Sequence, residues 1–427
     1  MSNELQRADK GVIGVLKTLA MSNTERINSL NRGITEYHPC TFDAFFEPSK
    51  GVYNSVVSGG NPKLRVDAMV AQSICAVQNG FPVIVLHEGN RLLEQQLKNN
   101  FSSSGKYIEI SSRNPCFEPF YGLDEDEISE QILETIPKKY DIKVSVSQYI
   151  KGISEVLSKN KKHLSFKMFS TCPHGLIFDK VDELRMRGVI TDLEEREIKT
   201  KLMIGQSENY KLDAFLASLK KEIKSIMYVA KSGYKPVSII SAIQMNSVLC
   251  FDITSTTNRL LLNTIISQFK LALTKELHYT IVIDSVPFGS SEIFGEFLKI
   301  SSDKICKMFV SDDFYTTVGS DEKAFSTIIG ESEIIIVMGH TTDLSAKKWS
   351  DVFGQYDKYE ETYSKAKGGS KRTPFSWFSC PNYQNSISIS KTREYIIKPE
   401  KITKMSDGEA YVLNAACGEY AHLVFNG

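Results

Sequence analysis

Short apolar runs rich in β-branched residues recur along the chain, and longer segments with helical periodicity separate them. The runs lack the alternation of apolar and polar positions that a strand with one solvated face shows. Such near-continuous apolarity is typical of strands buried on both faces of a parallel sheet. The strong runs, followed by two weaker ones, are residues 81–86, 248–253, 279–284 and 333–338, then 308–311 and 52–57. The pattern predicts strands at these places.

Segments with a helical period lie between these runs. In residues 258–277 the apolar positions recur close to every 3.6 residues, and residues 64–78 and 290–301 behave similarly. Strand, helix and strand joined by short connectors form the βαβ unit, whose repetition builds a doubly wound α/β core. We therefore expect an α/β fold with a mainly parallel sheet.

The middle of the chain differs from both flanks. Residues 122–229 contain no apolar run of comparable strength and are dominated by charged, helix-forming sequence. Thr191 followed by Glu194 forms a capping-box pattern, which predicts the start of a helix there. We expect an all-helical domain at 122–229, inserted into a core made of residues 51–121 and 230–427 and preceded by an N-terminal segment, residues 1–50.

Composition narrows the functional classes without choosing one. The chain has 427 residues, 51 Lys+Arg against 51 Asp+Glu and 41% apolar residues, as in ordinary globular proteins. A net charge of zero gives no overall attraction to nucleic acid or anionic membranes, so such binding would need local patches. The eight cysteines form no CxxC pair, and the chain shows neither a signal-peptide pattern nor a membrane-length apolar run. We expect a cytoplasmic protein without a structural metal.

The clearest candidate for chemistry is the segment 56–64, between an expected strand and an expected helix. A phosphate-binding loop needs glycines whose amides turn onto phosphate, a Lys, and a Ser or Thr for Mg²⁺. Gly59, Gly60 and Lys63 are the candidate nucleotide-binding residues. However, Pro62 stands where glycine belongs and Leu64 where the hydroxyl belongs. A plain structural turn is the alternative interpretation.

A phosphate loop needs an acidic partner at the end of a buried strand. Asp284 ends the run YTIVID and is the candidate ligand of Mg²⁺ if a nucleotide is bound. The residue that would orient the attacking water is usually Glu, and here it is Ser285. Asp252 ends a second buried run. The alternative role for either carboxylate is a helix cap or a loop anchor.

A basic stretch, residues 364–373, resembles a mobile loop and is followed by aromatic residues. Basic and aromatic side chains together can follow a phosphate backbone and stack on bases. The candidate DNA-binding residues are therefore Lys365, Lys367, Lys371 and Arg372, and a merely solvated loop is the alternative.

Histidine and cysteine give weaker signals. His87 and His340 follow expected strands, where α/β folds place ligands, although a histidine satisfied within its own loop is the favoured interpretation. Cys172 and His174 form half of a metal-site pattern, and no second pair lies at zinc spacing.

Taken in order, these features resemble the cytosolic ATPase portion of conjugative coupling proteins of type IV secretion systems, within the hexameric DNA-pumping ATPases. The resemblance begins near residue 50. It is carried by the Lys63 loop, by GFPVIVLHEGNRLLEQQL, by SVLCFDITSTTNRLLLNTIISQFKLAL before YTIVID, by EIIIVMGHTTDLSAKKWSDVFG, with Gly339, Asp343, Ser345, Ala346, Ser350 and Gly354, and by ISISKTREYIIKPEKITKMSDGEAYVLNA. It implies a RecA-like P-loop NTPase core with an inserted all-α domain, and ATP and Mg²⁺ as cofactors.

The departures from the family pattern concern catalysis. Pro62, Leu64 and Ser285 replace groups that hold phosphate, bind metal and orient water, and residues 309–313 lack the usual sensing Gln. The membrane helices of many coupling proteins are also not seen. Because phosphoryl transfer depends on such positioned groups, we expect a degenerate, non-hydrolysing subunit of a DNA-transfer or secretion machine.

Two other functions stay open at this point. One is an active ATP-driven DNA translocase or secretion motor with an atypical loop. The other is a module that recruits substrates through its helical domain. The resemblance implies an active ATPase paralogue or a second copy of the chain as partner, with DNA and a secreted or relaxosome-type protein as further candidates.

Overall fold

The computed structural model describes residues 38–137, 145–160, 164–171, 176–204, 206–230, 233–254, 259–285, 291–368, 382–415 and 417–426. The chain divides into two compact units. The larger is Cys40–Ile335, with Gly427, and the smaller combines Met1–Pro39 with Ile336–Asn426. Each unit is described by itself below.

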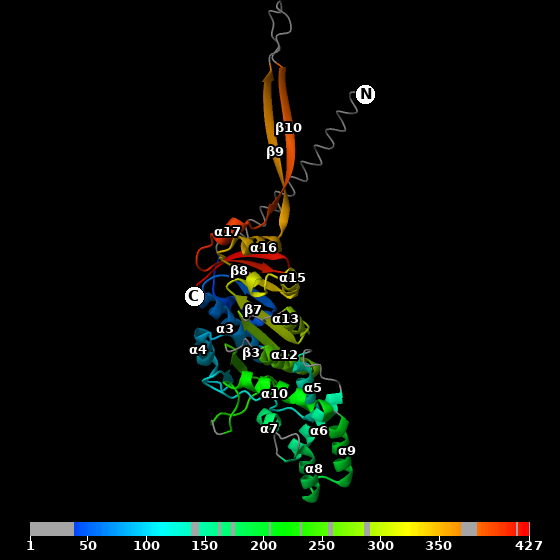
Figure 1. The fold of residues 1–427 in the computed structure, drawn as a ribbon. Coiled ribbons are helices and arrows are strands. Elements are labelled where there is room, and N and C mark those ends of the chain that lie inside the picture. Colours follow the sequence, from blue (N-terminus) through cyan, green and yellow to red (C-terminus); the bar gives the residue numbers. More distant parts are fainter. Residues whose placement is uncertain are drawn as a thin grey trace, which may run out of the picture. The chain divides into compact units, whose positions relative to one another are not determined.

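A sheet of parallel strands forms the centre of the larger unit (Figure 1). Its six strands lie in the order β2 (Ser55–Ser58), β7 (Ile305–Ser311), β6 (Tyr279–Asp284), β3 (Val83–His87), β5 (Val248–Asp252) and β4 (Tyr107–Ile110). Every neighbouring pair in this order is parallel. The predicted α/β class with a RecA-like, mainly parallel core is confirmed.

The helices that connect the strands cover both faces of the sheet. Right-handed crossovers from β2 to β3 and from β3 to β4 place their helices on one face, while the crossovers from β5 to β6 and from β6 to β7 run the opposite way and place theirs on the other. The first pair is α3 (Pro62–Gln78) and α4 (Arg91–Phe101), and the second is α12 (Arg259–Thr274) and α13 (Ser291–Leu298). Members of each pair contact each other. The core is therefore doubly wound, as predicted.

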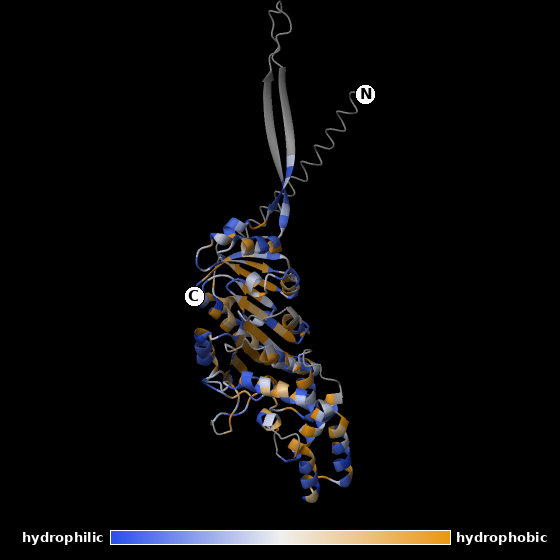
Figure 2. Cartoon of the chain, in the orientation of Figure 1, coloured by the Kyte–Doolittle hydropathy of each residue, from blue (hydrophilic) through white to orange (hydrophobic). Residues whose placement is uncertain are grey.

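The strands are buried along their whole length, which explains their continuous apolarity. All residues of β2, β3, β6 and β7 are buried, and the middle of the sheet is the most hydrophobic part of the ribbon in Figure 2. Phe269 of α12 stacks on Tyr279 of β6 with ring centroids 5.6 Å apart, and Phe297 of α13 packs edge-on against Phe309 of β7. Burial of each such ring stabilises the fold by about 1.5–3 kcal/mol.

Helices alone are assigned within the described part of residues 122–229. They are α5 (Glu125–Thr135), α6 (Ser145–Asn160), α7 (Phe166–Thr171), α8 (Ile177–Met186), α9 (Asp192–Ile204), a short 3₁₀ turn (Gln206–Glu208) and α10 (Asn209–Ile223). The predicted capping box is confirmed, because the Glu194 N–H donates to Thr191 Oγ1 at 3.2 Å and the Thr191 N–H to Glu194 Oε2 at 2.7 Å. The limits of an inserted domain stay a prediction.

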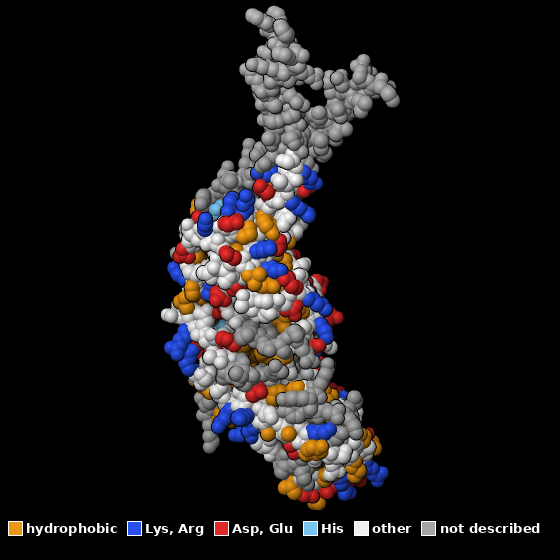
Figure 3. All heavy atoms as spheres, turned by 45° about the horizontal axis from the view of Figure 1, so that its top comes forward, with side chains coloured by type: hydrophobic (Ala, Val, Ile, Leu, Met, Phe, Trp, Pro, Cys, Tyr) orange, Lys and Arg blue, Asp and Glu red, His pale blue; other side chains and the backbone are white. Residues whose placement is uncertain are grey.

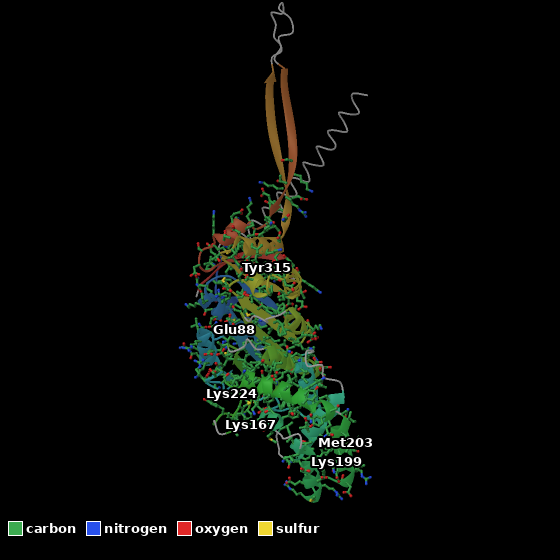
Figure 4. All side chains as sticks on the ribbon, viewed as in Figure 1. Glu88, Lys167, Lys199, Met203, Lys224 and Tyr315 are labelled. Carbon is green, nitrogen blue, oxygen red and sulfur yellow. The ribbon has the colours of Figure 1, made fainter. Side chains whose placement is uncertain are left out.

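Salt bridges hold neighbouring helices of this region together. Lys199 of α9 contacts Asp182 of α8 at 2.5 Å and Glu195 of its own helix at 2.7 Å, and it lies one turn from Met203 (Figure 4). α5 and α10 in turn pack on α12. The helical region is thus attached to the sheet through α12.

Shorter elements complete the larger unit. They are α2 (Phe42–Phe45), η1 (Pro48–Lys50), α11 (Ile239–Gln244), α14 (Phe314–Thr317) and α15 (Glu322–Glu331). Strand β1 (His38–Cys40) spans the division between the units.

The smaller unit contains most of β8 (Ile334–Met338), then α16 (Asp343–Phe353), β9 (Gln355–Gly368), β10 (Asn382–Tyr395), α17 (Pro399–Thr403), β11 (Glu409–Asn414) and β12 (Glu419–Phe425). β9 pairs with β10 and β11 with β12, both antiparallel. The expected mobile loop at 364–373 was wrong in its first half, because its residues up to Gly368 belong to β9. Polar strands of this kind leave no apolar run in the sequence.

None of the described helices combines the length and the apolarity that a membrane span requires.

Candidate functional site

A cavity of about 350 Å³ lies at the carboxyl edge of the parallel sheet. Its lining comes from the residues that follow three strands: Pro62 and Arg65 after β2, Glu88 and Asn90 after β3, and Asp284 and Ser285 at the end of β6. Between β3 and β6 the connecting helices change from one face of the sheet to the other. Ligands of open α/β sheets bind outside the strand ends at such a point. Glu88 marks this edge in Figure 4.

Asp284, the predicted metal ligand, lies in this cavity and is held by its neighbours. It is 8% exposed. The Asn90 side-chain amide donates to Asp284 Oδ2 at 2.6 Å, and the Ser285 hydroxyl donates to Oδ1 at 3.2 Å. Ser285 has a positive φ of 52°, a conformation that costs a non-glycine residue about 1 kcal/mol or more. The contacts agree with the alternative role of loop anchor, because both carboxylate oxygens already accept hydrogen bonds.

The connection between β2 and α3 is too short for a phosphate loop. If Lys63 were the lysine of the motif, the loop would begin six residues earlier, at Val57. Instead Val57 and Ser58 belong to β2 and lie opposite Val310 and Ser311 of β7. Three residues remain between strand and helix, and the N–H of the first, Gly59, donates to the Ser311 carbonyl at 3.0 Å.

The N-terminus of α3 is occupied by groups of the chain itself. Asn61 caps the helix by accepting the Leu64 N–H at 2.8 Å, and its carbonyl accepts the Arg65 N–H at 3.3 Å. Pro62 has no N–H to offer. Arg65 donates from Nη1 to the Gly60 carbonyl at 2.6 Å, so carbonyls rather than amides of the glycine pair face this cation. The positive φ values of Gly59 and Gly60, 90° and 71°, serve this tight turn.

Lys63 is exposed and does not line the cavity. The cation that does is Arg65, which neither the Walker-type motif nor the spacing indicated. Leu64 is buried at 3% exposure and has no group that could bind a metal. A magnesium nucleotide would need inward amides, a free lysine and a hydroxyl here. The described residues of this site do not supply that set of contacts.

Acidic side chains make the rest of this edge electronegative. Burial, followed by the charges of Asp252 and Asp284, raises the pKa of Glu88. Burial alone would raise the pKa of Asp252, but hydrogen bonds from the Thr254 hydroxyl and from the Thr254 and Gly89 amides lower it. No group of three or more metal-binding side chains forms among the described residues.

His87 lies between the two acidic strand ends and is fully buried. It stands opposite Asp252 on one side and Asp284 on the other. Its Nδ1 accepts the Asn90 N–H at 3.1 Å, and Nε2 lies 3.2 Å from Cys250 Sγ. Burial lowers its pKa despite the nearby carboxylates. These contacts match the interpretation of a satisfied histidine.

His340 is satisfied in the same way within the smaller unit. It is 4% exposed, its Nδ1 lies 2.7 Å from the Met338 carbonyl, and the Trp349 indole donates to its Nε2 at 3.1 Å. Cys172 and His174 lie outside the described residues.

The predicted DNA-binding residues are only partly described. Lys365 and Lys367 lie on β9 at backbone positions opposite Asn385 and Tyr383 of β10. Lys371 and Arg372 fall outside the described residues, so DNA binding stays a prediction. Figure 3 shows Lys and Arg side chains interspersed with Asp and Glu over the visible face rather than gathered in one broad field.

Comparison with known proteins gives structural neighbours only. No protein-family model matches the chain, and no curated protein matches it. It is similar to a bacterial conjugative coupling protein, TrwBdeltaN70, at 14% identity over 94% of this chain and 92% of that one, with a TM-score of 0.49. TrwB in complex with ADP and Mg²⁺ matches at 14% identity, 93% and 91% coverage and a TM-score of 0.47.

VirB4 of Thermoanaerobacter pseudethanolicus matches at 8% identity over 88% of this chain and 89% of that one, with a TM-score of 0.46. These proteins are of the class that the sequence resembles. Identities this low concern the fold alone.

Proposed function

We propose that this chain is a degenerate member of the P-loop ATPase fold that does not hydrolyse ATP and acts as a structural or regulatory subunit of a DNA-transfer or secretion machine. The observation that carries the proposal is the three-residue connection from β2 to α3. A phosphate cradle is made of backbone amides, so it cannot form where the strand occupies part of the loop.

The contacts of the acidic strand end support the same conclusion. Asp284 accepts hydrogen bonds from Asn90 and Ser285 and so has a structural task in the absence of any metal. Phosphoryl transfer requires the metal, the water-orienting residue and the phosphate cradle together. Here the cradle lacks the length and the orienting position is Ser285.

A partner of the same fold is the natural setting for such a subunit. A chain that keeps the layered core but not the phosphate contacts still presents the surfaces through which subunits pack. We propose an active ATPase paralogue or a second copy of the chain as partner, with DNA and a secreted protein as cargo of the whole machine.

Recruitment of a protein substrate by the helical region is the second candidate. Large apolar side chains are exposed on α8 and α9 and between them: Met186 at 83%, Leu193 at 67% and Met203 at 63%. Exposed apolar residues that gather on one element can mark a protein-binding surface. Replacing Met186 and Leu193 by Ser should then abolish capture of that substrate and leave the fold unchanged.

Steady-state hydrolysis and nucleotide binding on the purified chain, with and without DNA, test the first proposal. We expect turnover indistinguishable from a protein-free blank, and the same result for Lys63→Ala. Turnover that disappears in both Lys63→Ala and Asp284→Asn would overturn the proposal in favour of an active motor.

A further inference from the structure

The outer edge of β4 is open. β4 is the last strand of the parallel sheet and pairs only with β5 among the described strands. In a parallel ladder the N–H and C=O of alternate residues point to the same side. Because the Val248 N–H donates to the Lys106 carbonyl, the main-chain groups of Tyr107 and Glu109 point away from the sheet.

Part of this outward edge has no partner. The Glu109 carbonyl accepts from the Asn114 side-chain amide at 2.5 Å and from the Cys116 thiol at 3.2 Å. The N–H and C=O of Tyr107 and the N–H of Glu109 have no hydrogen bond to any described residue. A partly buried strand edge with free donors and acceptors is a template for another extended chain.

A groove of about 880 Å³ follows this edge and shares no residue with the smaller cavity. Helix α4 forms one side of the groove through Arg91, Gln95 and Lys98. The segment that contains Tyr234 and Lys235 forms the other. Tyr234 is 43% exposed, and Met245, which also lines the groove, is 52% exposed. The groove thus offers apolar surface next to the open edge.

The charge of the groove is positive. Its lining includes four cationic side chains and two acidic ones. Arg113 contacts both acids, Glu94 and Glu109. The other cations, Arg91, Lys98 and Lys235, are exposed and form no ion pair with a described residue. Charge complementarity therefore favours a negatively charged occupant.

We propose that the β4 edge and this groove bind an extended acidic segment of a partner protein, which adds a strand beside β4. The free N–H and C=O groups of Tyr107 and Glu109 distinguish a peptide from a nucleic acid, because only a peptide backbone carries the matching donors and acceptors. Arg91, Lys98 and Lys235 attract its carboxylates, and Tyr234 and Met245 contact its alternate apolar side chains.

Binding of a labelled peptide of about ten residues that alternates Glu and Val tests this proposal by fluorescence anisotropy. We expect saturable binding in the micromolar range that weakens at high salt. The same peptide with every second amide N-methylated cannot pair with a strand and should bind at least about tenfold more weakly.

A double charge reversal, Lys98→Glu with Lys235→Glu, should lower the affinity at least about tenfold. The matched control is Lys323→Glu with Lys404→Glu, which changes the net charge equally at exposed lysines outside the groove and should retain binding. Thermal unfolding of both variants checks that each is folded.

Three outcomes would overturn the proposal. They are equal binding of a Lys–Val peptide, equal binding of the N-methylated peptide, and loss of affinity in the control pair as large as in the groove pair. Tight binding of a single-stranded oligonucleotide that depends on Lys98 and Lys235, with no peptide binding, would instead assign the groove to nucleic acid.

Discussion

The two cavities along the parallel sheet differ in what their polar groups already bind. In the smaller one, at the strand ends, Asn61, Arg65, Asn90 and Asp284 are hydrogen-bonded within the chain. In the groove beside β4, main-chain groups and three cations have no partner among the described residues. A polar group that lost its ligand is costly when buried. The difference indicates that the fold's usual ligand position has been closed by its own side chains, whereas the sheet edge remains available.

One buried carboxylate breaks this simple division and gives the largest expected effect. Glu118 follows the groove-lining Cys116 and accepts the Phe166 N–H at 2.6 Å with one oxygen, while the other has no partner. Burial raises its pKa to about 7, although the amides of Phe166 and Phe120 act in the opposite direction. The folded chain therefore keeps this proton over a range in which the unfolded chain has lost it.

The sign of the resulting pH dependence follows from linkage. Because the unfolded state binds fewer protons than the folded state between about pH 4.5 and 7, stability falls as pH rises through this window. Glu118→Gln should remove the fall and stabilise the chain by about 3 kcal/mol at pH 8. Urea unfolding at pH 5 and pH 8 measures this, with exposed Glu130→Gln as control. Parallel pH profiles for wild type and Glu118→Gln would refute it.

The anchor role of Asp284 predicts the next largest effect. Asp284→Ala leaves the Asn90 amide without its acceptor in a mostly buried site, so unfolding free energy should fall by about 1–3 kcal/mol. Denaturant unfolding measures the loss. If Asp284 served only as a metal ligand, removing a buried carboxylate would leave stability unchanged or increase it, and millimolar Mg²⁺ with ATP would raise the melting temperature of the wild type.

The cap of α3 predicts a smaller effect. Asn61→Ala removes the side chain that accepts the Leu64 N–H, so stability should fall by about 1 kcal/mol. Lys63→Ala, two residues along the same turn, removes an exposed side chain and should stay within about 0.5 kcal/mol of wild type. Equal losses for both variants in thermal unfolding would show that Lys63 has a contact role comparable with that of Asn61.

Much of the fold could be predicted because buried parallel strands leave continuous apolar runs. β3, β5, β6, β7 and β8 were found this way. β4 was missed because it lies at the edge and its sequence, YIEI, carries a charge. β9 and β10 were missed because their solvated sequences contain no such run.

The candidate site could be predicted only as far as the strand ends. Asp284 follows from the end of YTIVID, whereas its partner Asn90 is 194 residues distant in the chain. The end of β2 is likewise set by pairing with β7, some 250 positions later. A one-dimensional pattern could therefore register Pro62 and Leu64 as defects but could not reveal that the loop is too short.

This shortness predicts the smallest effect, from a change that looks like a repair. Pro62→Gly with Leu64→Thr restores the glycine and the hydroxyl of the phosphate-loop pattern without lengthening the connection. Because Val57 and Ser58 remain in β2, the amides needed for phosphate still have no loop to occupy, and ATP turnover should stay at the level of the blank. A third variant with two glycines inserted after Gly60 separates length from residue type. Turnover in the double variant without the insertion would show that residue identity, and not the length of the connection, closes this site.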